Sequence, residues 1–294
     1  MRPEATLPPA EPKLISSLKL GRKMKYSVLY FILIVVAGLQ LLPLVWLFFF
    51  SLKNNQEVFN LPPLALPTHF RWENYQKVWE AGNISVYFFN SVWITVVATG
   101  FTIMLGGLAT FAITRMKWKG SSLALGLFMV AMMIPVHSTL IPLFSMFNSI
   151  GLKDNPLELI LTYVAFNMPI TIMIMLGFYY ALPREVEEAA VMDGCTINRL
   201  FFQIILPMTS SVIATTAIIN MIYNWNEFIF VNTFISSDSL KTLTVGVQNF
   251  IGQYTTDWGS IGATLMISIL PILIMFLFLS NRIMEGLTAG SVKG

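Results

Sequence analysis

The segment EAAVMDGCTINRLFFQIILP, residues 188–207, lies between two apolar runs that are each long enough to cross a membrane, yet it is not itself membrane-like. Carboxylates gather at its start and favour the positive end of a helix dipole. Gly194 can take the left-handed conformation that ends a helix, and Pro207 marks a break before the next run. These signals predict a helix, a turn and a second helix over residues 183–207. Such a polar hairpin has no core of its own, so we expect another protein to hold it.

The composition is that of a polytopic membrane protein. Hydrophobic residues make up 55% of the 294 residues and charged residues only 11%, well outside the balance of a soluble domain. The net charge of +3 is small and spread over many loops, so no nucleic-acid partner is expected. The single cysteine, Cys195, excludes an intrachain disulfide and a cysteine-based metal cluster.

Several runs are long enough to span a bilayer. A helix needs about 20 apolar residues to cross the ~30 Å hydrocarbon layer. Six runs qualify, at about 26–51, 85–114, 121–147, 157–181, 208–234 and 259–281. The expected fold is therefore all-α, with six transmembrane helices and one hairpin outside the membrane. Small residues in the second run, among them Gly106 and Gly107, would let a neighbouring helix approach closely.

The remaining segments complete the domain organisation. Residues 1–25 are basic, rich in proline and free of apolar runs, which predicts a largely disordered arm. Residues 52–84 form a loop between the first two spans. A core transmembrane domain is expected over residues 85–284, including the hairpin 183–207, and residues 285–294 form a tail.

The distribution of basic residues predicts the orientation. With the N-terminus in the cytoplasm, inner segments hold thirteen Lys or Arg and outer loops hold five. This asymmetry satisfies the positive-inside rule. Both termini and the hairpin are therefore expected on the cytoplasmic side, and the loops at about 52–84 and 235–258 on the outer side.

The hairpin resembles the EAA loop of the membrane subunits of ATP-binding-cassette (ABC) importers. The family pattern is EAA, three residues, G, nine residues, then I, any residue, L and P. The residues in register here are Glu188, Ala189, Ala190, Gly194, Ile204, Leu206 and Pro207. The likeness extends from about residue 26 to the C-terminus and is greatest to the sugar-importing branch typified by the second membrane subunit of maltose transporters. Supporting segments are FFNSVWIT at 88–95, MMIP at 132–135, YNWNEF at 223–228 and GLTAGSVKG at 286–294.

The resemblance implies a cytoplasmic coupling-helix pair seated in a cleft of a separate ATPase subunit. The implied coupling residues are Glu188, Ala189, Ala190, Asp193, Gly194 and Pro207. It also implies a second homologous permease subunit forming a heterodimer, two ATP-binding subunits and an extracytoplasmic solute-binding protein in a bacterial or archaeal inner membrane. The chain lacks a GxxxxGK[ST] phosphate loop, so we expect ATP and Mg to bind only at the partner ATPase subunits. We therefore expect that the chain is not itself an enzyme and that it binds no cofactor or metal.

A polar stripe in the fifth run suggests a substrate pathway. Asn220, Tyr223, Asn224 and Glu227 share one helical face, and Tyr163 and Asn167 form a weaker group in the fourth run. Polar side chains within a span are costly and invite a functional interpretation. Amides and aromatic rings suit the hydroxyls and apolar faces of a sugar. The alternative is that these groups only hydrogen-bond between helices; Asn220 and Asn224 fit either interpretation, and Glu227 fits the structural one better.

The last outer loop is expected to contact the binding protein. In the family this loop reaches towards the sugar pocket of the docked binding protein, which makes candidates of Gln248, Asn249, Gln253 and Tyr254. The tail at 286–294 is similar to the family tail that touches the ATPase dimer.

Other functions remain as alternatives at this stage. The same machinery could import glycerol phosphate or a polyamine. However, the spans contain no Lys or Arg to bind a phosphate group, and Glu227 is a single carboxylate where a polyamine needs a pair of acidic groups. A secondary transporter or channel would usually show internal repeats and more intramembrane charge. A membrane enzyme finds no support, because His69 and His137 are a whole span apart.

Overall fold

The computed structural model describes residues 12–116, 118–252 and 256–291, and over these ranges the chain is helical. The one strand-like contact there is an isolated antiparallel bridge between Ile251 and Thr256. The expected all-α fold is confirmed. The helices are α1 (Pro12–Ser51), α2 (Asn55–Asn60), α3 (Glu73–Ala81), α4 (Ile84–Arg115), α5 (Ser121–Ala131), η1 (Val136–Thr139), α6 (Leu140–Ser149), α7 (Pro156–Ala181), α8 (Arg184–Met192), α9 (Ile197–Arg199), η2 (Leu200–Ile205), α10 (Leu206–Met208), α11 (Ser210–Asn226), α12 (Ile229–Phe234), η3 (Asp238–Leu240), α13 (Leu243–Gly246), η4 (Val247–Phe250) and α14 (Trp258–Ser291).

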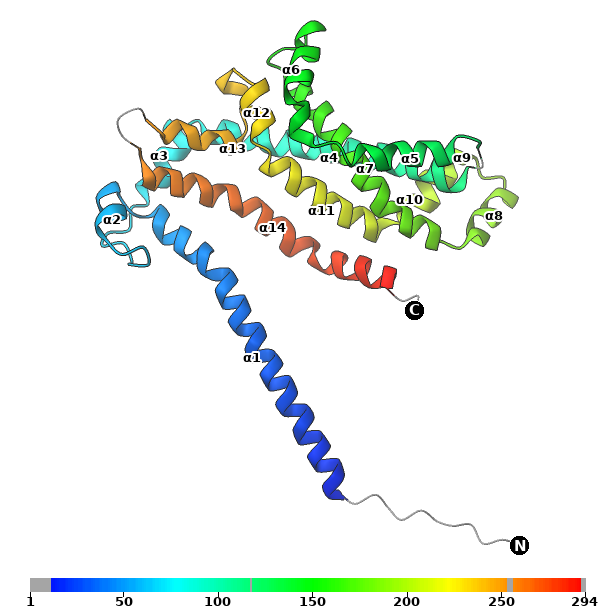
Figure 1. Ribbon diagram of the computed structural model, residues 1–294, viewed down its shortest axis with the longest axis horizontal. Coiled ribbons are helices and arrows are strands. Elements are labelled where there is room, and N and C mark those ends of the chain that lie inside the picture. The colour runs from blue at the N-terminus through cyan, green and yellow to red at the C-terminus, as the bar shows by residue number, and fades with distance from the viewer. Residues whose placement is uncertain (1–11, 117, 253–255, 292–294) are drawn as a thin grey trace.

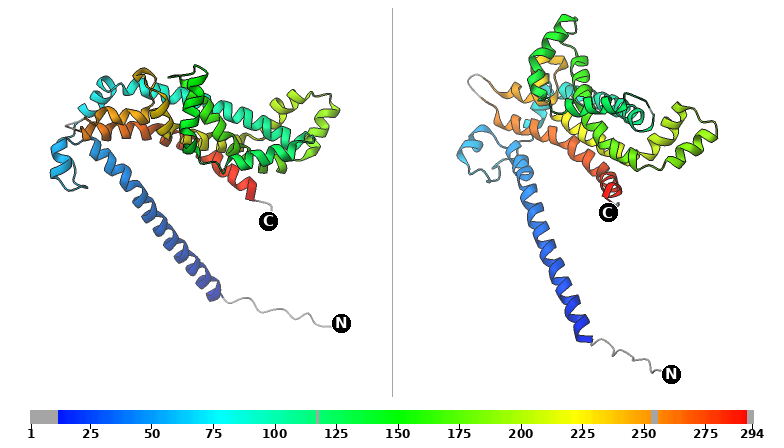
Figure 2. Two further views of the ribbon diagram at one scale, coloured as in Figure 1. Left: turned by 45° about the horizontal axis from the view of Figure 1, so that its top comes forward. Right: turned by 45° about the vertical axis from the view of Figure 1, so that its right-hand side comes forward.

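The body of the molecule is a bundle of long helices. α4 packs along α7, and α11 lies against α4, α7 and α14 (Figures 1 and 2). α1 touches this body at its C-terminal end, where it meets α14, and the rest of α1 stands away from the bundle (Figure 1). The most apolar stretch within Lys25–Ser51 accordingly has no buried residue within the chain, whereas Ser51 at its end is buried.

The bundle has two distinct ends. The hairpin containing α8 lies at one end, and α2, α3 and the start of α14 lie at the other (Figures 1 and 2). The N-terminal end of α1 and the C-terminal end of α14 both point towards the hairpin side. The hairpin and the two ends of the described chain therefore share one side of the molecule, as an even number of crossings requires.

The membrane-spanning helices number four to six. Four described helices are long and apolar enough to cross a bilayer: Lys25–Ser51, Ile84–Arg115, Pro156–Ala181 and Trp258–Phe278. Two further pairs pass only together, and each is sharply bent: Ser121–Ala131 with Val136–Ser149 at 92°, and Ile197–Met208 with Ser210–Asn226 at 78°. Counting each bent pair as one span gives six, of which four are continuous helices and two are broken.

The expected continuous third span, 121–147, is wrong. α5 ends at Ala131, and the chain turns through Met132–Pro135 before η1 and α6. Pro135 has no amide hydrogen, and proline disfavours a helical conformation at the residue before it. The sequence MMIP, which reads as apolar, is therefore a bend.

The expected fifth span, 208–234, is also wrong as a single helix. α11 ends at Asn226, and Glu227 is extended, with φ −69° and ψ 127°. The short helix α12 follows, so Glu227 does not continue the helical face of Asn220 and Asn224. The physical reason is that the Glu227 carboxylate binds the free amides at the start of α12, as described below.

The two ends of the chain differ from expectation as well. α1 begins at Pro12, so the expected disorder is wrong for residues 12–25, while residues 1–11 lie outside the described ranges. α14 continues to Ser291, and the tail expected from residue 285 is therefore largely helical. The loop 52–84 contains two helices, α2 and α3.

Small residues allow α4 and α7 to approach closely, as expected. A Cβ atom placed on Gly106 would lie 2.8 Å from Cγ2 of Thr171 in α7, which is closer than real Cβ contacts. Thr102 and Thr110 turn their hydroxyls back to carbonyls of α4, at 2.8 and 2.7 Å, so that these buried polar groups are satisfied within their own helix. Helix contact in a membrane depends on such close packing, because lipid is as apolar as the helix surface.

Candidate functional site

The first limb of the hairpin ends in a glycine turn. Gly194 has φ +76°, and its amide donates to the carbonyl of Val191 at 3.0 Å. The amide of Cys195 donates to the carbonyl of Ala190 at 2.9 Å. Together these two bonds form a Schellman motif, which satisfies the last carbonyls of α8 and requires the left-handed conformation at Gly194. The predicted helix and glycine turn are confirmed.

The second limb leads back to the bundle. The Thr196 side chain accepts from the amide of Arg199 at 3.5 Å and caps α9. The chain then continues through the π-helix η2 into α10, where Pro207 occupies the first turn. The 78° bend to α11 follows at once, so the predicted break near Pro207 is confirmed.

The hairpin exposes an apolar patch among charged groups. Met192 is 86% exposed, and Val191 and Ile197 are exposed beside it. Of the predicted coupling residues, Glu188, Ala189, Asp193, Gly194 and Pro207 are exposed. Ala190 is buried, in a cluster with Leu200 and Phe201, so it packs the hairpin onto the bundle instead. Exposed apolar groups rimmed by charge are typical of a protein interaction site.

A cavity of about 870 Å³ opens beside the bend in the third span. Five of the six residues predicted for a substrate pathway line it: Tyr163, Asn167, Tyr223, Asn224 and Glu227. The break at residues 132–135 brings His137 to the same wall, and the aromatic rings of Phe166, Phe228 and Phe230 complete it. Sequence reasoning missed the three phenylalanines and favoured a packing role for His137, because the meeting of these residues depends on two bends that apolar runs do not reveal.

Asn220 does not line the cavity. Its side chain is fully buried, and its Nδ2 donates to Oγ1 of Thr171 at 2.9 Å. Its Oδ1 has no hydrogen-bond partner within the described part of the chain. Asn220 therefore joins α11 to α7. This is the structural role, one of the two roles that the sequence suggested for it.

Asn224 belongs to a polar chain across three helices. Its Nδ2 donates to Oγ1 of Thr99 in α4 at 3.2 Å, and its Oδ1 accepts from Nδ2 of Asn167 in α7 at 2.7 Å. These bonds fix the orientation of both amides at the wall of the cavity. Asn224 thus bridges helices, as its structural interpretation expects, and it also lines the cavity; its contact with a solute stays a prediction.

Glu227 is the N-terminal cap of α12. Its carboxylate accepts from the amides of Ile229, Phe230 and Val231 at 2.9 to 3.2 Å. Its side chain is 14% exposed, and its Oε1 lies 3.8 Å from Nε2 of His137. These bonds give Glu227 a structural role at the start of α12, because they hold the bend that shapes the cavity. Among the described residues, no group of three or more His, Cys, Asp or Glu could hold a metal ion.

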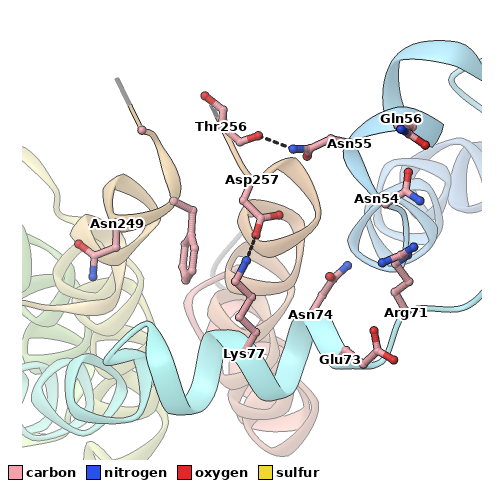
Figure 3. A pocket seen from close by; sticks show the side chains of 12 residues that line it. Asn54, Asn55, Gln56, Arg71, Glu73, Asn74, Lys77, Asn249, Thr256 and Asp257 are labelled. Atoms are coloured by element: carbon pink, nitrogen blue, oxygen red, sulfur yellow. Dashed lines mark hydrogen bonds and ion pairs between the residues drawn. The ribbon is translucent and has the colours of Figure 1, made fainter. Parts of the chain in front are cut away.

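A second, polar cavity of about 910 Å³ lies at the opposite end from the hairpin (Figure 3). Its walls come from α2, α3 and the segment before α14. Asn55 donates to the carbonyl of Thr256 at 2.8 Å, and Lys77 forms an ion pair with Asp257. Partial burial raises the pKa of Asp257, but hydrogen bonds from Lys77 and Ser260 lower that pKa more, so it ends below its ordinary value.

Two of the four residues predicted to contact a binding protein, Gln248 and Asn249, lie at or next to this polar cavity. Asn249 lines it, and its Nδ2 donates to the carbonyl of Gly82 and to the Tyr87 hydroxyl, both at 3.1 Å. Gln248 is exposed. Gln253 and Tyr254 lie outside the described residues.

Known proteins resemble the chain over most of its length. Residues 98–287 match the family described as binding-protein-dependent transport system inner membrane component. The chain is 34% identical over 275 residues to the probable ABC transporter permease protein YurM of Bacillus subtilis, covering 94% of this chain and 90% of that protein. It is 32% identical over 262 residues to the trehalose transport system permease protein SugB of Mycobacterium tuberculosis, covering 88% and 95%. It is 31% identical over 254 residues to the sulfoquinovosyl glycerol transport system permease protein SmoH of Agrobacterium fabrum, covering 86% and 89%.

A solved structure shares the fold. It belongs to a bacterial ABC transporter involved in the import of the acidic polysaccharide alginate, with a TM-score of 0.76 and 18% identity over 90% of this chain and 98% of that one. Permease subunits of this kind lack ATPase activity and a bound cofactor, and they work in the inner membrane with an ATPase and a binding protein. The chain therefore belongs to the binding-protein-dependent transport system inner membrane component family and is a multi-pass permease subunit of an ABC transporter.

Proposed function

We propose that this permease subunit imports an uncharged sugar, most simply an oligosaccharide, by alternating access. The observation that carries the proposal is the cavity of about 870 Å³, which places three asparagine amides beside tyrosine and phenylalanine rings. Rings stack on the apolar faces of sugars, and amides both donate to and accept from hydroxyls. Relatives named for trehalose, diacetylchitobiose and melibiose, raffinose and stachyose support the same class of solute.

The charges of the cavity argue against the other solutes. Its described lining contains no Lys or Arg, so a phosphate or carboxylate group would lack a cationic partner. Its one carboxylate, Glu227, is already engaged by backbone amides and so offers little to a polyamine. An uncharged, hydroxyl-rich solute matches the remaining groups.

In the proposed assembly, the chain pairs with a second homologous permease and docks on two ATPase subunits. The hairpin would carry the docking, because Met192 and Val191 are exposed next to Glu188 and Asp193. ATP binding closes the ATPases, the hairpin moves with them, and the cavity changes from inward to outward facing. The unburied apolar surface of α1 supports the pairing, because it is free to pack against the second permease.

At the outer end, the binding protein would dock over the polar cavity shown in Figure 3 and bring its sugar to the permease pair. Gln248 and Asn249 support this placement, since one is exposed and the other lines that cavity. The hairpin and both termini would then lie in the cytoplasm.

The proposal is tested by uptake in proteoliposomes that contain the whole transporter and its binding protein. Replacement of Tyr223, which lines the cavity and is exposed, by alanine should weaken uptake of the sugar while leaving the assembled complex intact. Loss of one stacking ring should weaken the interaction with the sugar by about 1 kcal/mol, which corresponds to a roughly fivefold fall in uptake. Asn220→Leu serves as the comparison, since it should reduce assembly through loss of its bond to Thr171.

Two results would contradict the proposal. One is stimulation of ATP hydrolysis by phosphate esters or polyamines but not by any uncharged sugar in a broad panel. The other is an unchanged rate of sugar uptake by the Tyr223→Ala transporter.

A further inference from the structure

One buried ion pair joins the hairpin to the transmembrane bundle. Arg115 is the last residue of α4, and its Nε lies 3.1 Å from Oε1 of Glu187 in α8. The two side chains are only 5% and 15% exposed. A buried charge that loses its partner is strongly unfavourable, so each of these side chains needs the other where it is.

Arg115 also binds the end of α7. Its Nη2 donates to the carbonyl of Leu182 at 3.0 Å and to the carbonyl of Tyr179. Tyr179 lies in the last turn of α7 and Leu182 is its C-cap residue, and the negative end of the helix dipole there favours a cation. A single guanidinium thus contacts the ends of α4 and α7 and the first limb of the hairpin.

The packing around this point is tight. Phe111 of α4, Tyr179 of α7 and Ala190 of α8 belong to one buried cluster, together with residues of the second limb of the hairpin. Apolar contacts of this kind let helices slide past one another, because they have no fixed direction. The guanidinium differs, since its Nη2 donates directional hydrogen bonds to two carbonyls at the end of α7, while its charge holds the Glu187 carboxylate in an ion pair.

We propose that Arg115 is a positioning residue that transmits movement of the coupling helix α8 to the transmembrane helices α4 and α7. This inference rests on the proposed docking of the hairpin on the ATPase, and it deepens that function by assigning a role to a residue outside the hairpin. When the ATPase moves α8, the displacement of Glu187 shifts Arg115. The shift of Arg115 in turn displaces the ends of α4 and α7. α7 and the end of α11 line the cavity, so the movement reaches the solute pathway.

The test uses the whole transporter, reconstituted with its ATPase and binding protein. Glu187→Gln removes the charge with little change of shape, and Arg115→Lys keeps the charge but loses the fork. Glu187→Gln leaves the buried Arg115 charge without its partner, so we expect less assembled complex for it than for Arg115→Lys, and a fall in uptake per assembled complex of roughly tenfold or more. ATP hydrolysed per solute imported should rise in both, and less so for Arg115→Lys. Lys119→Met, which removes an exposed cation close to the same end of α4, is the matched control and should behave as wild type.

A double variant separates transmission from folding. Arg115→Met with Glu187→Leu leaves no unpaired buried charge, so assembly should recover to the wild-type amount. We expect stimulation of ATP hydrolysis by the binding protein to stay low, because the directional link is absent. Recovery of stimulation and uptake in this double variant would overturn the proposal, and so would wild-type uptake by Glu187→Gln.

The proposed docking itself is judged by a different result. If the wild-type chain fails to co-purify with its ATPase, the docking role of the hairpin is wrong. If it co-purifies and imports, but the Arg115 and Glu187 variants keep normal coupling, only the role of Arg115 is wrong.

Discussion

At the scale of single residues, the hairpin depends on one backbone conformation. Gly194 has φ +76°, and a Cβ atom at that position would have no neighbour within 4 Å among the described residues. Lack of space therefore does not explain the glycine at this position. The left-handed backbone conformation explains it, because a side chain with a Cβ atom in that conformation approaches the following carbonyl, which costs about 1–2 kcal/mol.

This distinction gives a prediction for two substitutions at the same position. Gly194→Leu should strain the turn, reduce co-purification of the ATPase and lower uptake by at least about tenfold, while membrane insertion is unchanged. Gly194→Asn should retain most of both activities, because asparagine tolerates the left-handed region. Pull-down of the ATPase and uptake assays measure the effect. Equal behaviour of the two variants would show that the conformation at Gly194 does not matter for docking.

At the scale of elements, α14 is shaped to receive the end of α1. A Cβ atom on Gly262 would lie 2.7 Å from Cδ1 of Phe50 and 2.8 Å from Cα of Ser51. A Cβ atom on Gly259 would lie 2.3 Å from the carbonyl oxygen of Lys53. These glycines let the end of α1 contact α14, while the rest of α1 remains unpacked by this chain.

Gly262→Ala should therefore destabilise the protein. The added methyl group forces α1 away from α14. Overpacking of this kind lowers the free energy of unfolding by about 1–3 kcal/mol. The matched control is Gly100→Ala, because a Cβ atom at Gly100 in α4 has no described atom within 4 Å. Thermal unfolding in detergent or nanodiscs should show a lower midpoint for Gly262→Ala only. A midpoint equal to that of the control would mean that α1 and α14 separate without cost.

At the scale of the whole molecule, the two ends of the bundle carry different chemistry. The hairpin end exposes apolar and charged groups, and the opposite end holds the polar cavity between α2, α3 and the start of α14 (Figures 1 and 3). The two ends of the described chain point to the hairpin side. The excess of basic residues on that side predicts that it faces the cytoplasm.

Cysteine labelling can check this orientation. In a Cys195→Ser background, Met192→Cys marks the hairpin end and Leu64→Cys marks the opposite end; the native side chains are 86% and 70% exposed. A membrane-impermeant maleimide should label residue 64 in right-side-out spheroplasts and residue 192 only in inside-out vesicles. Cells that lack the ATPase subunit avoid masking of residue 192. The reverse pattern would invert the proposed topology.

The sequence by itself determined the all-α membrane fold, the hairpin with its glycine turn, and the family. These features are local, because apolar run length, capping residues and a spaced motif are each contained within one stretch of chain. Only the tertiary structure decided that the bend at Pro135 brings His137 to the cavity wall and that Glu227 caps α12 and leaves the α11 face. It likewise decided that Ala190 and Asn220 are buried and that Arg115 pairs with Glu187. The physical reason is that these outcomes depend on which distant side chains and backbone amides meet in space, and an apolar run or a short motif carries no record of those partners.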